Sequence, residues 1–110
     1  KLFNPNPDFL SYTLSKAALQ QATVLAAQAL APRIRVMGIA PGLSLRSGDQ
    51  SDADFAQKHG QTLLQRGSTP ADIAHALLYV LSAPSMTGTT LLVDGGQHLS
   101  PSPRDVMFLS

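Results

Sequence analysis

Apolar positions in the first third of the chain recur at three- and four-residue steps, which is the pattern of one helix face. This pattern predicts a long helix over residues 9–30, with Asp8 as its N-cap and Pro32 as its end. The apolar stripe of this helix consists of Leu14, Ala18, Ala22, Leu25 and Ala29.

Two short runs without helical periodicity predict strands, over 34–40 and 90–93. The first run is mostly apolar, as is typical of a strand that is buried in a parallel sheet. The second run is the last strand expected in this sequence. Pro41-Gly42 ends the first run and Asp94-Gly95-Gly96 ends the second, because glycine and proline mark turns.

Two further helices are expected between these strands. Residues 69–72, Thr-Pro-Ala-Asp, supply an N-cap, a proline at the first helical position and a carboxylate that resembles a capping box, and Pro84 ends this helix. A weaker pattern predicts a helix within 52–64, although Gly60 interrupts it. Alternation of helices and strands predicts an α/β fold with a parallel sheet. Since two strands do not make a stable sheet, we expect most of the sheet to be missing from this sequence.

Composition narrows the classes of function. A hydrophobic share of 44% against 14% charged residues indicates a core-forming chain, and the net charge of +1 gives no electrostatic reason to bind nucleic acid. There is no cysteine, which excludes disulfides and thiolate chemistry and fits a cytoplasmic location. No apolar run approaches the roughly 20 residues of a membrane span. The three histidines share no metal-ligand spacing, so no metal site is expected.

Tyr12 and Lys16 stand four residues apart in the first predicted helix, so both side chains lie on one face. A phenol is a poor proton donor or acceptor near neutrality, and a nearby cation stabilises its phenolate form. Such a tyrosine can donate a proton to a carbonyl or imine that receives hydride. By itself the pair is weak evidence, because this spacing occurs by chance in many helices.

The segment that follows the first predicted strand is the second candidate for binding. Ligands bind at the carboxyl ends of parallel strands in open α/β sheets. Gly42 permits close approach of the backbone to a planar ring, Leu43 offers backbone polar groups, and Ser44 offers a hydroxyl to a phosphate or an amide. The plain alternative is an ordinary turn that ends a strand.

Together, these fragments resemble the short-chain dehydrogenase/reductase family. Tyr-x-x-x-Lys, Ile-Arg-Val-x-x-Ile-x-Pro-Gly, a capped helix and Thr-Gly-x-x-x-x-Val-Asp-Gly-Gly follow one another in family order from residue 11 to 98. The resemblance implies a Rossmann-like, doubly wound parallel sheet. It also implies that Tyr12 is the catalytic acid/base and that Lys16 assists it and binds the nicotinamide ribose. The residues expected to flank the nicotinamide or its phosphates are Pro41, Gly42, Leu43 and Ser44.

The same resemblance predicts what this sequence lacks. Residues 1–110 correspond to the C-terminal part of a single domain, without the glycine-rich nucleotide-binding half. The third catalytic group of the family, usually serine, is expected upstream of Lys1. Met37 stands where the family usually has asparagine, and Arg46 stands where many members carry threonine, which increases the weight on Ser44.

Residues 38–44 and 95–99 resemble the branch of pteridine reductases and dihydromonapterin or dihydrofolate reductase-like proteins, which implies NADPH as the reductant, with NAD not excluded. The predicted reaction is hydride transfer to a carbonyl or to a pterin C=N. The alternatives are an NAD-dependent alcohol dehydrogenase, a non-catalytic scaffold, and an epimerase or dehydratase. The Val-Asp-Gly-Gly ending disfavours the last of these, because it belongs to the compact members of the family.

Other residues have less specific expected roles. Phe55 and Leu63 fall in the segment that covers the substrate in the family, although simple packing is an equal alternative. The alanine-rich first helix, with the resemblance, implies a homodimer or homotetramer. His98 follows the last strand, where the resemblance allows it to approach the active site of a partner subunit, but a solvated turn is the favoured expectation.

Overall fold

The computed structural model describes residues 10–42 and 51–99, and the statements below concern these residues. Their elements, in chain order, are α1 (Leu10–Leu30), β1 (Gly38–Pro41), α2 (Asp52–His59), α3 (Pro70–Ser82), β2 (Thr90–Val93) and the 3-10 turn η1 (Gln97–Leu99).

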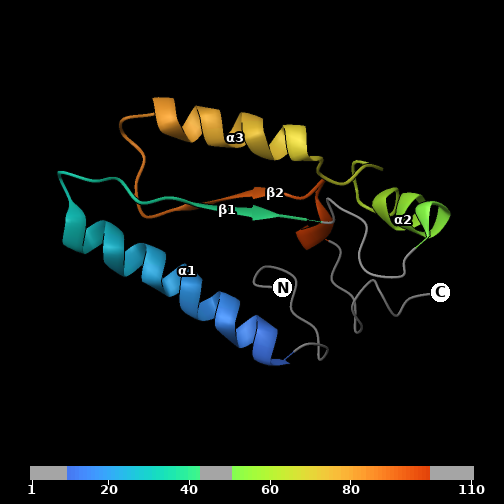
Figure 1. The fold of residues 1–110 in the computed structure, drawn as a ribbon, viewed down its shortest axis with the longest axis horizontal. Coiled ribbons are helices and arrows are strands. Elements are labelled where there is room, and N and C mark those ends of the chain that lie inside the picture. The colour runs from blue at the N-terminus through green and yellow to red at the C-terminus, as the bar shows by residue number, and fades with distance from the viewer. Residues whose placement is uncertain (1–9, 43–50, 100–110) are drawn as a thin grey trace.

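The two strands form a parallel pair, with Gly38 opposite Thr90 and Pro41 opposite Val93. Helix α3 contacts both strands, and α1 lies on the opposite face of the sheet from α3 (Figure 1). This helix–sheet–helix layering confirms the predicted α/β class with a parallel sheet.

Helix α1 begins at Leu10 and ends at Leu30, close to the predicted range, while the proposed N-cap Asp8 lies outside the described residues. Its C-terminal half approaches the loop that precedes β2. Ala27 is one of the buried residues, and a Cβ placed on Gly88 would lie 3.4 Å from the Ala27 Cβ. No helix within the described ranges is long and apolar enough to cross a bilayer.

The strand predicted over 34–40 is wrong in its first half, because β1 begins only at Gly38. Val36 is held by side-chain and loop groups: its N–H donates to Thr87 Oγ1 at 3.0 Å and its carbonyl accepts from the Gly88 N–H at 2.7 Å. Apolar content predicted a strand here, but ladder pairing with β2 begins only where Gly38 meets Thr90.

Arg35 has a role that the sequence analysis missed. Its guanidinium donates to the carbonyls of Val80 and Ala83 at 2.9 Å, and to those of Leu81 and Met86 at 3.2 and 3.3 Å. These carbonyls belong to the last turn of α3 and the residues after it, where the helix leaves acceptors unpaired. A cation at this end also interacts favourably with the helix dipole. Arg35 therefore fixes the end of α3 against the segment that leads into β1.

Helix α2 is shorter than the predicted 52–64. Ser51 caps it by accepting from the Asp54 N–H at 3.0 Å, and Gly60 ends it with a hydrogen bond to the carbonyl of Ala56. The sequence prediction that continued this helix to Leu64 is wrong, because the chain turns at the glycine that was recognised as an interruption.

The capping box predicted for α3 is confirmed. Thr69 Oγ1 accepts from the Asp72 N–H at 3.1 Å, and the Asp72 carboxylate accepts from the Thr69 N–H at 2.9 Å. This second hydrogen bond is the main cause that lowers the pKa of Asp72 below its usual value, and the Arg66 guanidinium, 2.7 Å from Asp72 Oδ2, adds to it. The helix ends at Ser82, before Pro84.

Candidate active site

The carboxyl ends of both strands lie on the side of the molecule where α1 begins (Figure 1). Because β1 and β2 are parallel, Pro41-Gly42 and Asp94-Gly95-Gly96 leave the sheet at the same edge. Tyr12 is the third residue of α1 and therefore belongs to this end of the molecule. The architecture thus directs the predicted catalytic helix and the predicted cofactor turn to the same side of the sheet.

Tyr12 and Lys16 interact directly, as their spacing predicted. Lys16 Nζ lies over the Tyr12 ring, 5.4 Å from its centroid, within the range of a cation–π contact. Both residues are exposed, with 54% of Tyr12 accessible. The pair is thus accessible to a ligand and carries a phenol and an ammonium on one helix face.

Gly42 packs more tightly than the sequence indicated. Its N–H donates to the carbonyl of Val93 at 3.1 Å, which continues the strand pairing by one residue. A Cβ at this position would lie 2.7 Å from the Asp94 Cβ and 2.8 Å from the Asp94 Cα, closer than real Cβ atoms approach. Glycine is therefore required here by the neighbouring strand end. Leu43 and Ser44 lie outside the described residues.

Asp94 organises the turn that follows β2. Its buried carboxylate accepts from the N–H groups of Gly96 and His98, both at 3.0 Å. His98 Nδ1 lies 2.8 Å from Oδ2 and 3.0 Å from Oδ1, so a protonated Nδ1 donates to the same carboxylate. His98 lies in a turn after β2, as expected, but the expectation that it is solvated is wrong, because its side chain is only 26% exposed and is paired with Asp94. The Asp-x-x-x-His spacing was the signal for this pair.

The two candidates for substrate contact lie in α2 and in the segment after it. Leu63 is 57% exposed, and its side chain lies against Gly96, where an added Cβ would come within 3.1 Å of the Leu63 Cβ. Phe55 lies in α2, and its side chain is outside the described part. Their predicted contact with a substrate stays a prediction.

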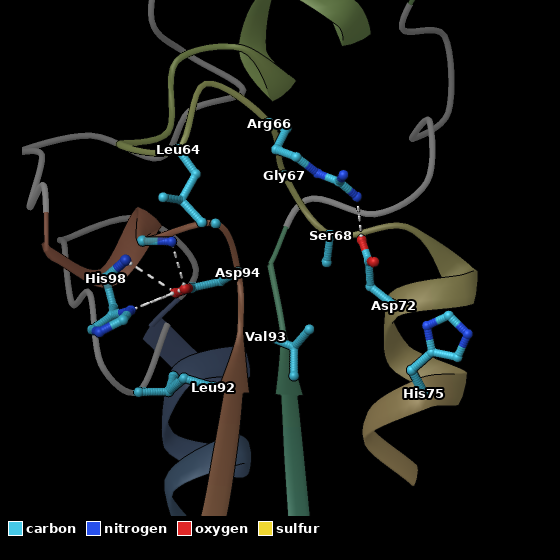
Figure 2. Close-up of a pocket in the computed structure, with 12 residues that line it drawn as sticks. Leu64, Arg66, Gly67, Ser68, Asp72, His75, Leu92, Val93, Asp94 and His98 are labelled. Carbon is cyan, nitrogen blue, oxygen red and sulfur yellow. Dashed lines mark hydrogen bonds and ion pairs between the residues drawn. The ribbon is translucent and has the colours of Figure 1, made fainter. Parts of the chain in front are cut away.

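A hollow of about 530 Å³ lies at the end of β2 and is lined by residues of α3 and of the turn after β2 (Figure 2). Arg66, Asp72 and His75 line it from one side, and Leu92 to Gly96 and His98 line it from the other. Neither the Tyr12–Lys16 pair nor Gly42 is among its lining residues. We therefore place the candidate chemistry at the exposed Tyr12–Lys16 pair rather than in this hollow. Within 10–42 and 51–99, no cluster of His, Asp and Glu could hold a metal ion.

The chain has relatives among known proteins. A family model described as enoyl-(acyl carrier protein) reductase matches residues 3–98. An uncharacterized oxidoreductase of Mycobacterium tuberculosis is 44% identical over 94 residues, which is 80% of this chain and 36% of that protein. The dihydromonapterin reductase of Citrobacter koseri is 34% identical over 91 residues, 82% of this chain and 38% of that protein.

A solved structure is also similar. The alternative dihydrofolate reductase 1, FolM, of Brucella suis in complex with NADP superposes with a TM-score of 0.85 at 44% identity, and the match covers 92% of this chain and 41% of that one. The chain spans well under half the length of each of these three proteins. The predicted resemblance to dihydromonapterin and dihydrofolate reductases is thus confirmed, as is the predicted Rossmann-like fold, of which this chain covers a part.

Proposed function

Because the chain belongs to the short-chain dehydrogenase/reductase family, we propose that it carries the proton-donating and nicotinamide-side part of an NADPH-dependent reductase. The observation that supports this most directly is the Tyr12–Lys16 pair, a phenol with an ammonium 5.4 Å from its ring centroid at the start of α1. The residues present fit a nicotinamide nucleotide, since the start of α1, which carries the phenol and the ammonium, lies on the same side of the molecule as the glycine turn after β1 (Figure 1).

Each residue has a separate role in this proposal. Tyr12 donates a proton to the heteroatom of the double bond that is reduced, through its phenolic oxygen. Lys16 stabilises the phenolate that remains, because its positive charge lies over the ring. Bound NADPH supplies the hydride. The exposure of both side chains leaves the phenol accessible to a substrate from solvent.

Pro41 and Gly42 form the nicotinamide side of the proposed site. They end β1 at its carboxyl edge, and the hydrogen bond from Gly42 to the Val93 carbonyl fixes their backbone. A fixed backbone costs less conformational entropy when a ring binds against it. We extend the proposal to Leu43 and Ser44, which follow directly, and to a contact of Ser44 with the carboxamide or a phosphate.

The substrate class that we propose is a pterin C=N bond or a small carbonyl compound. Two relatives support the pterin choice by name, one a dihydromonapterin reductase and one an alternative dihydrofolate reductase in complex with NADP. Both are compared with this chain over a limited part of their length, so substrate choice rests on the branch resemblance. Contacts of Phe55 and Leu63 with the substrate belong to the same proposal.

Turnover measurements test the proposal. We expect the purified protein to oxidise NADPH with dihydrobiopterin or dihydrofolate, and Tyr12→Phe to lower turnover by about 10²- to 10⁴-fold, the usual contribution of a proton donor. NADPH binding, measured by fluorescence, is expected to persist in Tyr12→Phe because the ring that contacts Lys16 is retained.

Tyr79→Phe is the matched control, since Tyr79 lies on α3, is 59% exposed and takes no part in the proposed site. Its turnover is expected to equal that of the unaltered protein. Equal turnover in Tyr12→Phe would refute the role of the phenol. Failure of the unaltered protein to bind NADPH would refute the reductase proposal and favour a non-catalytic binding protein.

A further inference from the structure

The turn after β2 is closed by one carboxylate. Asp94 is buried and accepts hydrogen bonds from the N–H groups of Gly96 and His98, and the His98 ring is its third partner, with Nδ1 2.8 Å from Oδ2. Figure 2 shows the ring of His98 and the backbone of the turn hydrogen-bonded to the Asp94 carboxylate. A buried carboxylate needs such partners, because its desolvation is costly unless it is hydrogen-bonded.

This turn supports the proposed nicotinamide side of the site. The Gly42 Cα faces Asp94 so closely that a Cβ would lie 2.7 Å from the Asp94 Cβ and 3.0 Å from Gln97 Oε1. Gly42 also donates its N–H to Val93, the residue before Asp94. A shift of the turn would therefore move the backbone of Gly42.

The other side of the turn holds the segment that contains Leu63. The carbonyl of Gly95 accepts from the Leu64 N–H at 3.0 Å. Gly95 has a φ of 66°, and a Cβ there would overlap the carbonyl oxygen of Arg66, which itself accepts from Thr62 Oγ1 at 2.6 Å. Residues 62–66 are thus packed directly on the turn that Asp94 closes.

We propose that Asp94 and His98 are positioning residues that hold the nicotinamide-side turn at Gly42 and the substrate-side segment 62–66 in one arrangement. This inference rests on the proposed function, because that proposal assigns the nicotinamide to the turn at Gly42 and the substrate to the segment 62–66. Asp94 touches Gly42 directly, and His98 acts through Asp94 by occupying the carboxylate oxygens. Among the described residues, neither side chain forms a hydrogen bond or ion pair with Tyr12 or Lys16, so we expect their replacement to leave the proton donor itself unchanged.

His98 is the sharper target for an experiment. Replacing Asp94 removes the acceptor of three donors and endangers folding, whereas His98→Ala removes only the ring and leaves both backbone hydrogen bonds. His98→Asn restores a side-chain N–H at the δ position and serves as the rescue. His75→Ala is the matched control, because His75 is an exposed histidine of α3 that lies across the hollow from His98.

Steady-state kinetics give the functional readout. In His98→Ala we expect the KM values for NADPH and for the pterin to rise about three- to tenfold, with kcat within about twofold, because binding weakens equally in the ground state and the transition state while the proton donor is untouched. His98→Asn is expected to recover most of this loss and His75→Ala to show none. A fall in kcat alone, or no change in either KM, would overturn the inference.

Hydrogen exchange gives a readout that does not depend on activity. In His98→Ala we expect at least tenfold faster amide exchange in peptides that cover 38–42 and 61–66, with no change over 17–30 of α1. Unchanged exchange in the peptides 38–42 and 61–66 would overturn the proposal that the turn at Asp94 couples them, whatever the kinetic result. If the unaltered protein binds no NADPH, the proposed function fails, and this exchange pattern alone decides whether the turn couples the two segments.

Discussion

Gly95 and Gly88 both have a positive φ, at 66° and 74°, but their surroundings differ. A Cβ on Gly88 would make an ordinary contact with Ala27 at 3.4 Å, whereas a Cβ on Gly95 would overlap the Arg66 carbonyl oxygen and approach Thr62 Oγ1 to 2.9 Å. An added Cβ therefore causes only backbone strain at Gly88, whereas at Gly95 it causes backbone strain and steric overlap.

We predict that Gly88→Ala lowers the free energy of unfolding by about 1–2 kcal/mol, the cost of a left-handed conformation for a residue with a Cβ. Gly95→Ala is expected to lower it by at least about 2 kcal/mol more, because the strand-end turn and segment 62–66 must separate. Urea denaturation at one fixed protein concentration measures both values. Equal losses in the two variants would show that the overlap at Gly95 is relieved by a small shift.

Among single residues, the contact between Tyr12 and Lys16 and the strand-end glycines were predictable because their signal is local. Tyr12 and Lys16 meet through helical spacing alone. The pairing of His98 with Asp94 and the contact of Gly42 with Asp94 were missed. The first had a local signal in its four-residue spacing, whereas the second depends on which residue faces a neighbouring strand end, and single-residue patterns carry little information about that.

At the scale of elements, Arg35 connects the end of α3 to the segment before β1 through hydrogen bonds to four carbonyls. A planar guanidinium can donate hydrogen bonds to several acceptors at once, whereas the lysine ammonium is a compact point charge. We predict that Arg35→Lys lowers the free energy of unfolding by about 1–2 kcal/mol and Arg35→Ala by about 2–4 kcal/mol, since carbonyls at the helix end lose charged donors.

Arg33 supplies the control for this prediction, because it is exposed and lies two residues away in the same segment. Arg33→Lys is expected to change the free energy of unfolding by less than about 0.5 kcal/mol, as is usual for surface substitutions. Urea denaturation of the three variants at matched concentration gives the comparison. An Arg35→Lys value as small as that of Arg33→Lys would mean that charge alone, and not the guanidinium geometry, supports the end of α3.

Element types were predicted more accurately than element lengths. Capping and periodicity identified α1 and α3, whose signals lie within the helices themselves. The start of β1 at Gly38 was not predictable, because a strand begins where its neighbour pairs with it. The end of α2 at His59 depended on whether Gly60 bends the chain, which sequence alone left undecided.

At the scale of the whole molecule, the described residues bury little apolar surface. Ala27 and Val80 are the buried apolar side chains among them, while leucines along both outer helices are exposed. Large exposed apolar areas are places where other protein surface packs. The relatives of this chain extend well beyond the part that it matches, so the rest of such a domain packs on helices like these as well as a second subunit. The oligomer implied by the family resemblance stays a prediction, and the sequence assigned its contact to α1.

Leu25 on α1 and Leu81 on α3 are exposed to similar extents, 56% and 64%, so they distinguish which helix associates. If α1 is the contact, the 110-residue polypeptide sediments as more than 11.6 kDa, and its Tm rises with protein concentration, because association stabilises the folded state by mass action. Leu25→Gln is then expected to shift the protein toward the monomer and to remove the concentration dependence of Tm. Leu81→Gln is expected to leave both unchanged.

Analytical ultracentrifugation over a hundredfold range of protein concentration measures the size of the association product. The opposite ranking of the two variants would assign the contact to α3, and a monomer with a constant Tm would contradict the prediction of an oligomer for this polypeptide.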